Sequence, residues 1–165
     1  NNKRFHIIPL VLLSEKSGHY NHAGMLVYDS HTKSLERFEP HGYMDDDCYK
    51  GFDNQLQKLF KENMGDEYIK KYYEPLDFCP RFNFQRIEEL AKTDEYDATG
   101  YCLAWSIWYA ETRLSNPDIQ RDKMVQQAFN AFSHSSREMK EFIRIYAAFI
   151  DDLSIKLYYK VPQLT

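Results

Sequence analysis

A stretch rich in apolar residues begins at Cys102 and predicts a central helix. Its apolar positions recur at helical spacing, at Leu103, Ile107, Ala110 and Leu114. Because two tryptophans and a tyrosine fill other faces of the same stretch, we expect a helix that is apolar nearly all round and lies in the middle of the fold. Asp97 or Thr99 is expected to cap its start, which places Cys102 in the first helical turn.

Three runs near the start of the chain have the composition of β-strands. Residues 5–13, 22–29 and 35–40 are rich in branched and aromatic residues, and short polar segments separate them. A proline within the first run is tolerated at an edge strand or a bulge. We expect the second and third runs to pair as a hairpin, which brings His22 and Glu39 to the same edge of the sheet.

The middle of the chain mixes helical and extended patterns. Residues 53–64 have apolar positions at helical spacing and end at Gly65, so they predict an amphipathic helix. Residues 68–78 and 82–85 are expected to be extended. Residues 86–98 are acidic and polar, and we expect them to form a short helix and a loop before the central helix.

Two further helices are expected after the central helix. Asn116 and Pro117 suit the cap and the first position of a helix that runs through Phe132. Ser135 and Glu138 form a capping-box pattern that opens a last helix with apolar positions on one face. Strands followed by helices, with one helix apolar enough to lie against the sheet, indicate an α+β domain.

The composition is that of an ordinary globular protein. The 165 residues carry a formal net charge of -4, and no basic run interleaved with aromatic residues occurs, which argues against a general nucleic-acid binder. Three cysteines far apart in sequence, without a CxxC pair, indicate a reducing compartment. The longest apolar run, residues 7–13, is too short to span a bilayer. We expect one domain over residues 1–165, a monomer that does not use a membrane.

Four residues together have the composition of a thiol-nucleophile site. Such a site needs a thiolate, an imidazole that exchanges its proton, a group that orients the imidazole, and donors for an oxyanion. Cys102 stands at a helix start, which lowers a thiol pKa, and His22, Glu39 and Gln85 could fill the other roles. Taken singly, each also has an ordinary structural explanation, such as a small buried residue or a solvated carboxylate.

The arrangement of these residues resembles the adenovirus maturation protease, adenain, and the Ulp/SENP proteases of ubiquitin-like proteins. The hairpin that begins His22-Ala-Gly-Met-Leu-Val-Tyr-Asp and ends Phe-Glu39-Pro-His-Gly is similar to the adenain hairpin. The segment Gly-Tyr-Cys102-Leu-Ala-Trp-Ser resembles the nucleophile helix of the family more loosely. The resemblance covers residues 5–115 and implies a papain-like fold, with a mostly antiparallel sheet against the nucleophile-bearing helix and additional C-terminal helices.

Two positions differ from the family pattern. Ala23 stands where the family usually has a tryptophan that covers the substrate channel. Gln85 lies much further before Cys102 than the family's oxyanion glutamine does, so Asn83 is a competing donor. With these differences, the resemblance implies that His22 deprotonates Cys102, that Glu39 holds the imidazole, and that Gln85 stabilises the oxyanion.

The resemblance implies a cysteine protease that cleaves ubiquitin or ubiquitin-like modifiers, from a large DNA virus, acting in the host cytoplasm or the virion. An adenain-type polyprotein protease, a YopJ-like acetyltransferase and a non-catalytic binding module are the alternatives. No cofactor is expected. A zinc set of His19, His22 and either His41 or Cys48 is considered and set aside, because the spacing is unspecific.

Overall fold

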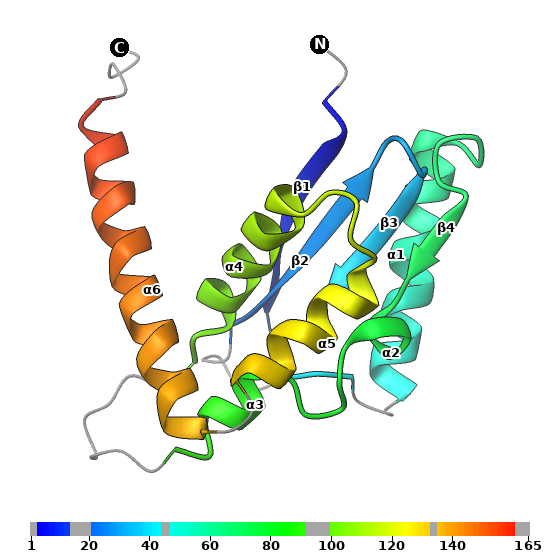
Figure 1. Ribbon diagram of the computed structural model, residues 1–165. Coiled ribbons are helices and arrows are strands. Elements are labelled where there is room, and N and C mark those ends of the chain that lie inside the picture. Colours follow the sequence, from blue (N-terminus) through cyan, green and yellow to red (C-terminus); the bar gives the residue numbers. More distant parts are fainter. Residues whose placement is uncertain (1–2, 14–20, 44–46, 92–99, 133–134, 161–165) are drawn as a thin grey trace.

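The computed structural model describes residues 3–13, 21–43, 47–91, 100–132 and 135–160. Its four strands form one sheet in the order β1-β2-β3-β4, and they are β1 (Phe5–Leu13), β2 (Asn21–Asp29), β3 (Ser34–Phe38) and β4 (Lys71–Tyr73). The helices of the described part are α1 (Asp47–Met64), α2 (Pro75–Phe78), α3 (Phe84–Glu88), α4 (Cys102–Ser115), α5 (Arg121–Phe132) and α6 (Ser136–Tyr158), as Figure 1 shows.

The expected hairpin is present and forms the centre of the sheet. Strands β2 and β3 are antiparallel, with Met25 opposite Phe38, and β1 pairs antiparallel with β2. Strand β1 lies at the edge, which is where a strand that contains Pro9 is tolerated. Strand β4 is parallel to β3, so the sheet is mostly but not wholly antiparallel.

Strand β2 is buried on both faces of the sheet. Met25 and Val27 belong to the larger apolar cluster, in which α4 packs across β2, whereas Leu26 and Tyr28 belong to a second cluster with Leu56 of α1. Successive side chains of a strand point to opposite faces, which explains why neighbours in the sequence belong to different clusters. Helices therefore cover both faces of the sheet, α4 on one and α1 on the other (Figure 1).

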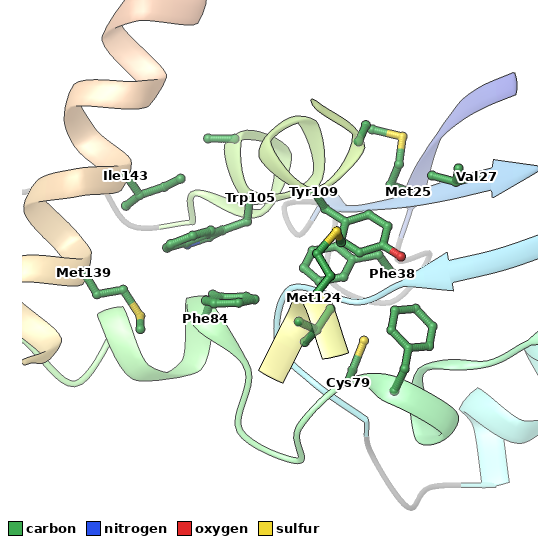
Figure 2. Close-up of a cluster of buried hydrophobic side chains, with 14 residues drawn as sticks. Met25, Val27, Phe38, Cys79, Phe84, Trp105, Tyr109, Met124, Met139 and Ile143 are labelled. Carbon is green, nitrogen blue, oxygen red and sulfur yellow. The ribbon is translucent and has the colours of Figure 1, made fainter. Parts of the chain in front are cut away.

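Aromatic side chains dominate the larger cluster, which Figure 2 shows. Trp105 of α4 is fully buried, and its ring stacks on Phe84 of α3 with 4.9 Å between centroids. Tyr109, one turn further along α4, stacks on Phe38 of β3 at 4.2 Å. Met139 of α6 packs at the edge of the same cluster (Figure 2). The first half of α6 is thus part of the core, and its second half extends beyond it (Figure 1).

The prediction was wrong in the segment that follows α1. Residues 68–78 were expected to be one strand, but only Lys71–Tyr73 pair with β3, and Pro75 opens helix α2 instead. Proline suits the first turn of a helix, where its missing N–H is not needed. Residues 82–85 were expected to be extended, but Phe84 begins helix α3. Tertiary packing of Phe84 against Trp105 outweighs the weak extended preference of this short segment.

The predicted helix boundaries are confirmed in part. Helix α4 begins at Cys102 as expected, and the Ser135 side chain accepts a hydrogen bond from the backbone N–H of Glu138, as the capping-box pattern predicts. Asn116, however, ends α4 rather than starting the next helix, which begins only at Arg121. Asp97 and Thr99, the predicted caps, lie outside the described residues, as do 92–98 of the predicted loop.

Helix α4 is not buried all round. The side chains of Leu103 and Leu114 are 51% and 48% exposed, because the helix packs on the sheet and on α3 and α6 but leaves one side open. The sequence pattern overestimated its burial.

The papain-like fold itself stays a prediction, since the described part shows only a mixed α and β architecture. Among the described residues, no helix combines the length and the apolar character that crossing a membrane requires.

Candidate functional site

The loop after β3 holds Glu39 at the end of the sheet. Its direction is fixed at Gly42, which has a φ of 102°, a conformation that favours glycine. A Cβ atom there would also lie 2.4 Å from the backbone oxygen of Arg81. Asn83 ties the loop from the other side, because its amide nitrogen donates to the Glu39 carbonyl at 2.8 Å. The carboxylate of Glu39 is therefore positioned by backbone constraints as well as by its own partners.

The structure brings three of the four predicted residues together. His22 Nε2 and Glu39 Oε1 are 2.5 Å apart, and Cys102 lies near enough to His22 for each to shift the pKa of the other. The three side chains come from β2, from the loop after β3 and from the start of α4. Ser106 of α4 donates to the Ala23 carbonyl of β2 at 3.3 Å, which keeps the start of α4 against the strand that carries His22.

The contacts of this cluster shift the pKa values of both proton-exchanging groups. Burial lowers the pKa of His22, but hydrogen bonds to Cys102 and Glu39 outweigh burial and raise it to about 9. Burial raises the pKa of Cys102, but the hydrogen bond to His22 and backbone N–H groups outweigh this, so its net pKa is lowered. Both shifts favour a thiolate at Cys102 paired with an imidazolium at His22. By contrast, burial raises the pKa of Cys79.

The fourth predicted residue is engaged elsewhere. Gln85 is buried on α3, and its amide nitrogen donates to Glu89 Oε1 at 3.1 Å. No hydrogen bond between Gln85 and Cys102 is present among the residues that the structure describes. The competing donor, Asn83, donates an amide N–H to the Glu39 carbonyl. Each of these amide nitrogens therefore has a hydrogen-bond partner other than the thiol.

Arg37 and His41 belong to the site although the sequence analysis did not assign them to it. Arg37 Nη1 donates to Glu39 Oε2 at 3.2 Å, and its other nitrogens bind both oxygens of Asp53, at 2.7 and 2.8 Å. The His41 ring stacks on His22 with 4.8 Å between centroids. One signal was available for Arg37, because residues two apart on a strand lie on the same face, which places Arg37 beside Glu39.

Alkylation of Cys102 tests the electrostatics of the cluster. In the His22→Gln variant the thiolate loses its hydrogen bond and its positive neighbour, so the pKa of Cys102 rises. We expect the rate of iodoacetamide labelling of Cys102 at pH 7, followed by peptide mass, to fall several-fold. The matched control is His41→Gln, which removes a neighbouring imidazole that does not bind the thiol. Equal rates in the wild type and His22→Gln would contradict the assigned contact.

Comparison with known proteins gives a viral relative. The chain is 34% identical over 164 residues to a protein of Acanthamoeba polyphaga mimivirus whose name describes it as an ankyrin repeat protein. The match includes 93% of this chain but only 21% of the relative, so the chain spans about a fifth of that protein's length. No protein-family model matches the chain, and no solved structure matches it.

This finding corrects the expected family and activity. The relative bears an ankyrin repeat name rather than a protease name. The prediction that this chain belongs to the adenain and Ulp/SENP proteases is therefore wrong, and so is the thiol protease or isopeptidase activity that was inferred from it. The prediction rested on a hairpin and a helix start, and short motifs of this kind produce false matches. A viral relative agrees with the expected viral source. Of the partner prediction, the finding supports neither ubiquitin, nor its relatives, nor a polyprotein as the partner.

The name of the relative does not describe the fold of this chain. Ankyrin repeats are units of about 33 residues that contain a turn and two helices. The described residues of this chain instead form a four-stranded sheet with helices on both faces.

Proposed function

We propose that this chain is a non-enzymatic protein-binding domain, and that the second half of α6 is its binding element. The mimivirus relative bears the name of a repeat-protein class that binds protein partners, and this name supports an interaction role although the described residues of this chain form no such repeats. The engagement of Gln85 and Asn83 away from the thiol supports the absence of a catalytic role. The observation that carries the proposal is the surface of α6.

An apolar stripe on α6 continues past the point where the core ends. Within the core, Phe142, Tyr146 and Ile150 pack against the larger cluster. The same face of the helix continues with Leu153 and Leu157, which follow at spacings of three and four residues. Their side chains are 43% and 53% exposed, and all of 151–160 is exposed. The helix thus presents an apolar face that no described element covers.

A protein with an apolar groove fits this surface better than a lipid bilayer does. A helix that presents apolar residues three and four apart is the form in which amphipathic helices enter grooves of partner proteins. Helices that lie on membranes carry mainly lysine and arginine on their polar face. Here Asp151 and Asp152 stand on the exposed half of α6 beside Lys156, which pairs with Asp152, so this face is not basic.

Two substitutions on opposite sides of α6 test the binding surface. Leu153→Glu places a charge in the apolar stripe, whereas Ile155→Glu, 57% exposed and two residues further on, places it on the other side of the helix. We expect Leu153→Glu to reduce capture of partner proteins from a lysate of expressing cells by about tenfold or more, as an interface anchor does. Ile155→Glu should leave capture unchanged, with both measured by quantitative mass spectrometry.

The comparison between the two variants decides the proposal, because both replace an exposed apolar side chain and should change stability little. Equal capture by Leu153→Glu and the wild type would contradict it. An equal loss of capture in both variants would also contradict it, since that result would reflect nonspecific hydrophobic adsorption. Concentration-dependent sedimentation of the wild type alone, abolished by Leu153→Glu, would instead show that the stripe binds a second copy of this chain.

A further inference from the structure

Two imidazoles and a carboxylate meet at the end of the hairpin. His22, Glu39 and His41 each offer one ligand atom, and these atoms all lie within 4.8 Å of one another. The two histidine rings are nearly parallel, with 9° between their planes. Glu39 is buried, and both histidines are half-buried. The hairpin and the turn at Gly42 create this group, since His22 and His41 are far apart in the sequence.

The charges around this group favour a cation. Arg37 is buried between two carboxylates, with both oxygens of Asp53 and one oxygen of Glu39 as partners. One guanidinium against two carboxylates leaves one negative charge in the buried cluster. Buried charges need a partner of opposite sign. The remaining Glu39 oxygen, Oε1, lies 2.5 Å from His22 Nε2, so this negative charge is balanced by a protonated His22 or by a cation that replaces its proton.

The ligand atoms are also oriented by groups outside the cluster. Glu89 Oε1 lies 3.1 Å from His41 Nε2, which leaves Nδ1 of the same ring as the nitrogen for a ligand. Arg37 holds Glu39 Oε2, and the backbone N–H of His41 donates to Oε1 at 3.2 Å. A carboxylate behind a histidine, together with a fixed ligating carboxylate, is the usual support of metal ligands in proteins.

We propose that His22, Glu39 and His41 form a binding site for a divalent transition-metal cation, for which Zn²⁺ is the best fit. Two imidazoles and one carboxylate, with a fourth position open to water, are a ligand set that Zn²⁺ accepts. The ion takes the place of the proton shared by His22 Nε2 and Glu39 Oε1. Ligands at about 2.0–2.2 Å from the ion draw the donor atoms closer together. Because a bound metal lies in the plane of each imidazole, the two half-buried rings must rotate out of their stacked arrangement to ligate one ion.

Zinc titration of the purified chain against a chromophoric chelator tests the site. We expect one Zn²⁺ per chain, and we expect His41→Gln and His22→Gln each to weaken binding at least about tenfold, as loss of a metal-supporting group does. His31→Gln is the matched control, because His31 is exposed at the turn between β2 and β3. Cys102→Ser should still bind one Zn²⁺ per chain, because Cys102 contributes no ligand to the site. Circular dichroism of each variant shows that the fold is retained.

Three outcomes would overturn this site. The first is the absence of zinc binding at micromolar concentration in the wild type. The second is stoichiometric binding that survives His41→Gln, and the third is binding that is lost in Cys102→Ser, which would assign the ion to the thiol. None of them bears on the binding role of α6, which is measured with substitutions at Leu153 and Ile155.

Discussion

Replacement of Trp105 by alanine is expected to lower the free energy of unfolding by about 3–5 kcal/mol. Trp105 is fully buried, and its ring contacts aromatic residues of three other elements at centroid distances of 4.9 to 6.3 Å, namely Phe84 of α3, Phe132 of α5 and Phe142 of α6. Removing the indole leaves a cavity that these rings cannot fill without moving. Since small domains have total stabilities of about 5–15 kcal/mol, the loss is large. Urea denaturation measures it.

Trp105→Phe is the matched control for this cavity. It keeps an aromatic ring in the layer and removes an indole N–H that has no hydrogen-bond partner among the described residues. We expect it to cost less than half of what Trp105→Ala costs. A loss below about 1 kcal/mol for Trp105→Ala would contradict the packing described here, because ordinary surface positions produce changes of that size.

Replacement of Arg37 by alanine is expected to cost about 3–5 kcal/mol, for an electrostatic reason. Arg37 is 2% exposed and is the charged partner of both Asp53 and Glu39, which are also buried. Without the guanidinium, the two carboxylates remain buried near each other with less compensation. Because the two carboxylates are buried, each needs a positively charged partner nearby. Urea denaturation at pH 7 measures the change in the free energy of unfolding.

Arg37→Met combined with Asp53→Leu separates the charge effect from the loss of side-chain volume. The double variant removes the ion pair as a whole, and a buried pair replaced by apolar residues of similar size often costs little. We expect it to be more stable than Arg37→Ala, with Glu39 keeping His22 as its partner. If the double variant were less stable than the single one, the uncompensated carboxylates would not be the cause of the destabilisation.

Local sequence patterns predicted the hairpin and α4 well because each is fixed by neighbouring residues. The runs of branched and aromatic residues in β2 and β3 are separated by a short polar turn, and their register follows from that turn. Cys102 was expected in the first turn of α4 and Ser135 at the cap of α6; Ser135 makes its cap hydrogen bond, whereas Tyr101 is the N-cap of α4 and makes none. These signals act over a few residues, so the rest of the fold does not change them.

The segment between α1 and α4 was not predictable in the same way. Strand β4 is only three residues long and depends on pairing with β3, which is distant in the sequence. Helix α3 is held by the burial of Phe84 against Trp105. The exposure of Leu103 and Leu114 also follows from where the sheet and the other helices end. All of these depend on tertiary contacts, which composition and periodicity do not contain.

The candidate site was also predictable only in part, and for the same reason. The proximity of His22 and Glu39 followed from the expected hairpin, and the family resemblance implied that Cys102 joins them. The engagement of Gln85 by Glu89 and the stacking of His41 on His22 did not, because they depend on how α3 packs beside the loop after β3. The family and activity were predicted wrongly from these local motifs, whereas the match over nearly the whole chain gives a different relative.

The most direct test of the binding role follows the fate of a captured partner. A partner retained by the wild-type chain and lost with Leu153→Glu is purified and incubated with the wild type and with Cys102→Ala, and its intact mass is recorded over time. A binding domain without catalytic activity leaves the mass unchanged in both cases, and both chains retain the partner equally. Cleavage of the partner by the wild type but not by Cys102→Ala would contradict the non-enzymatic role.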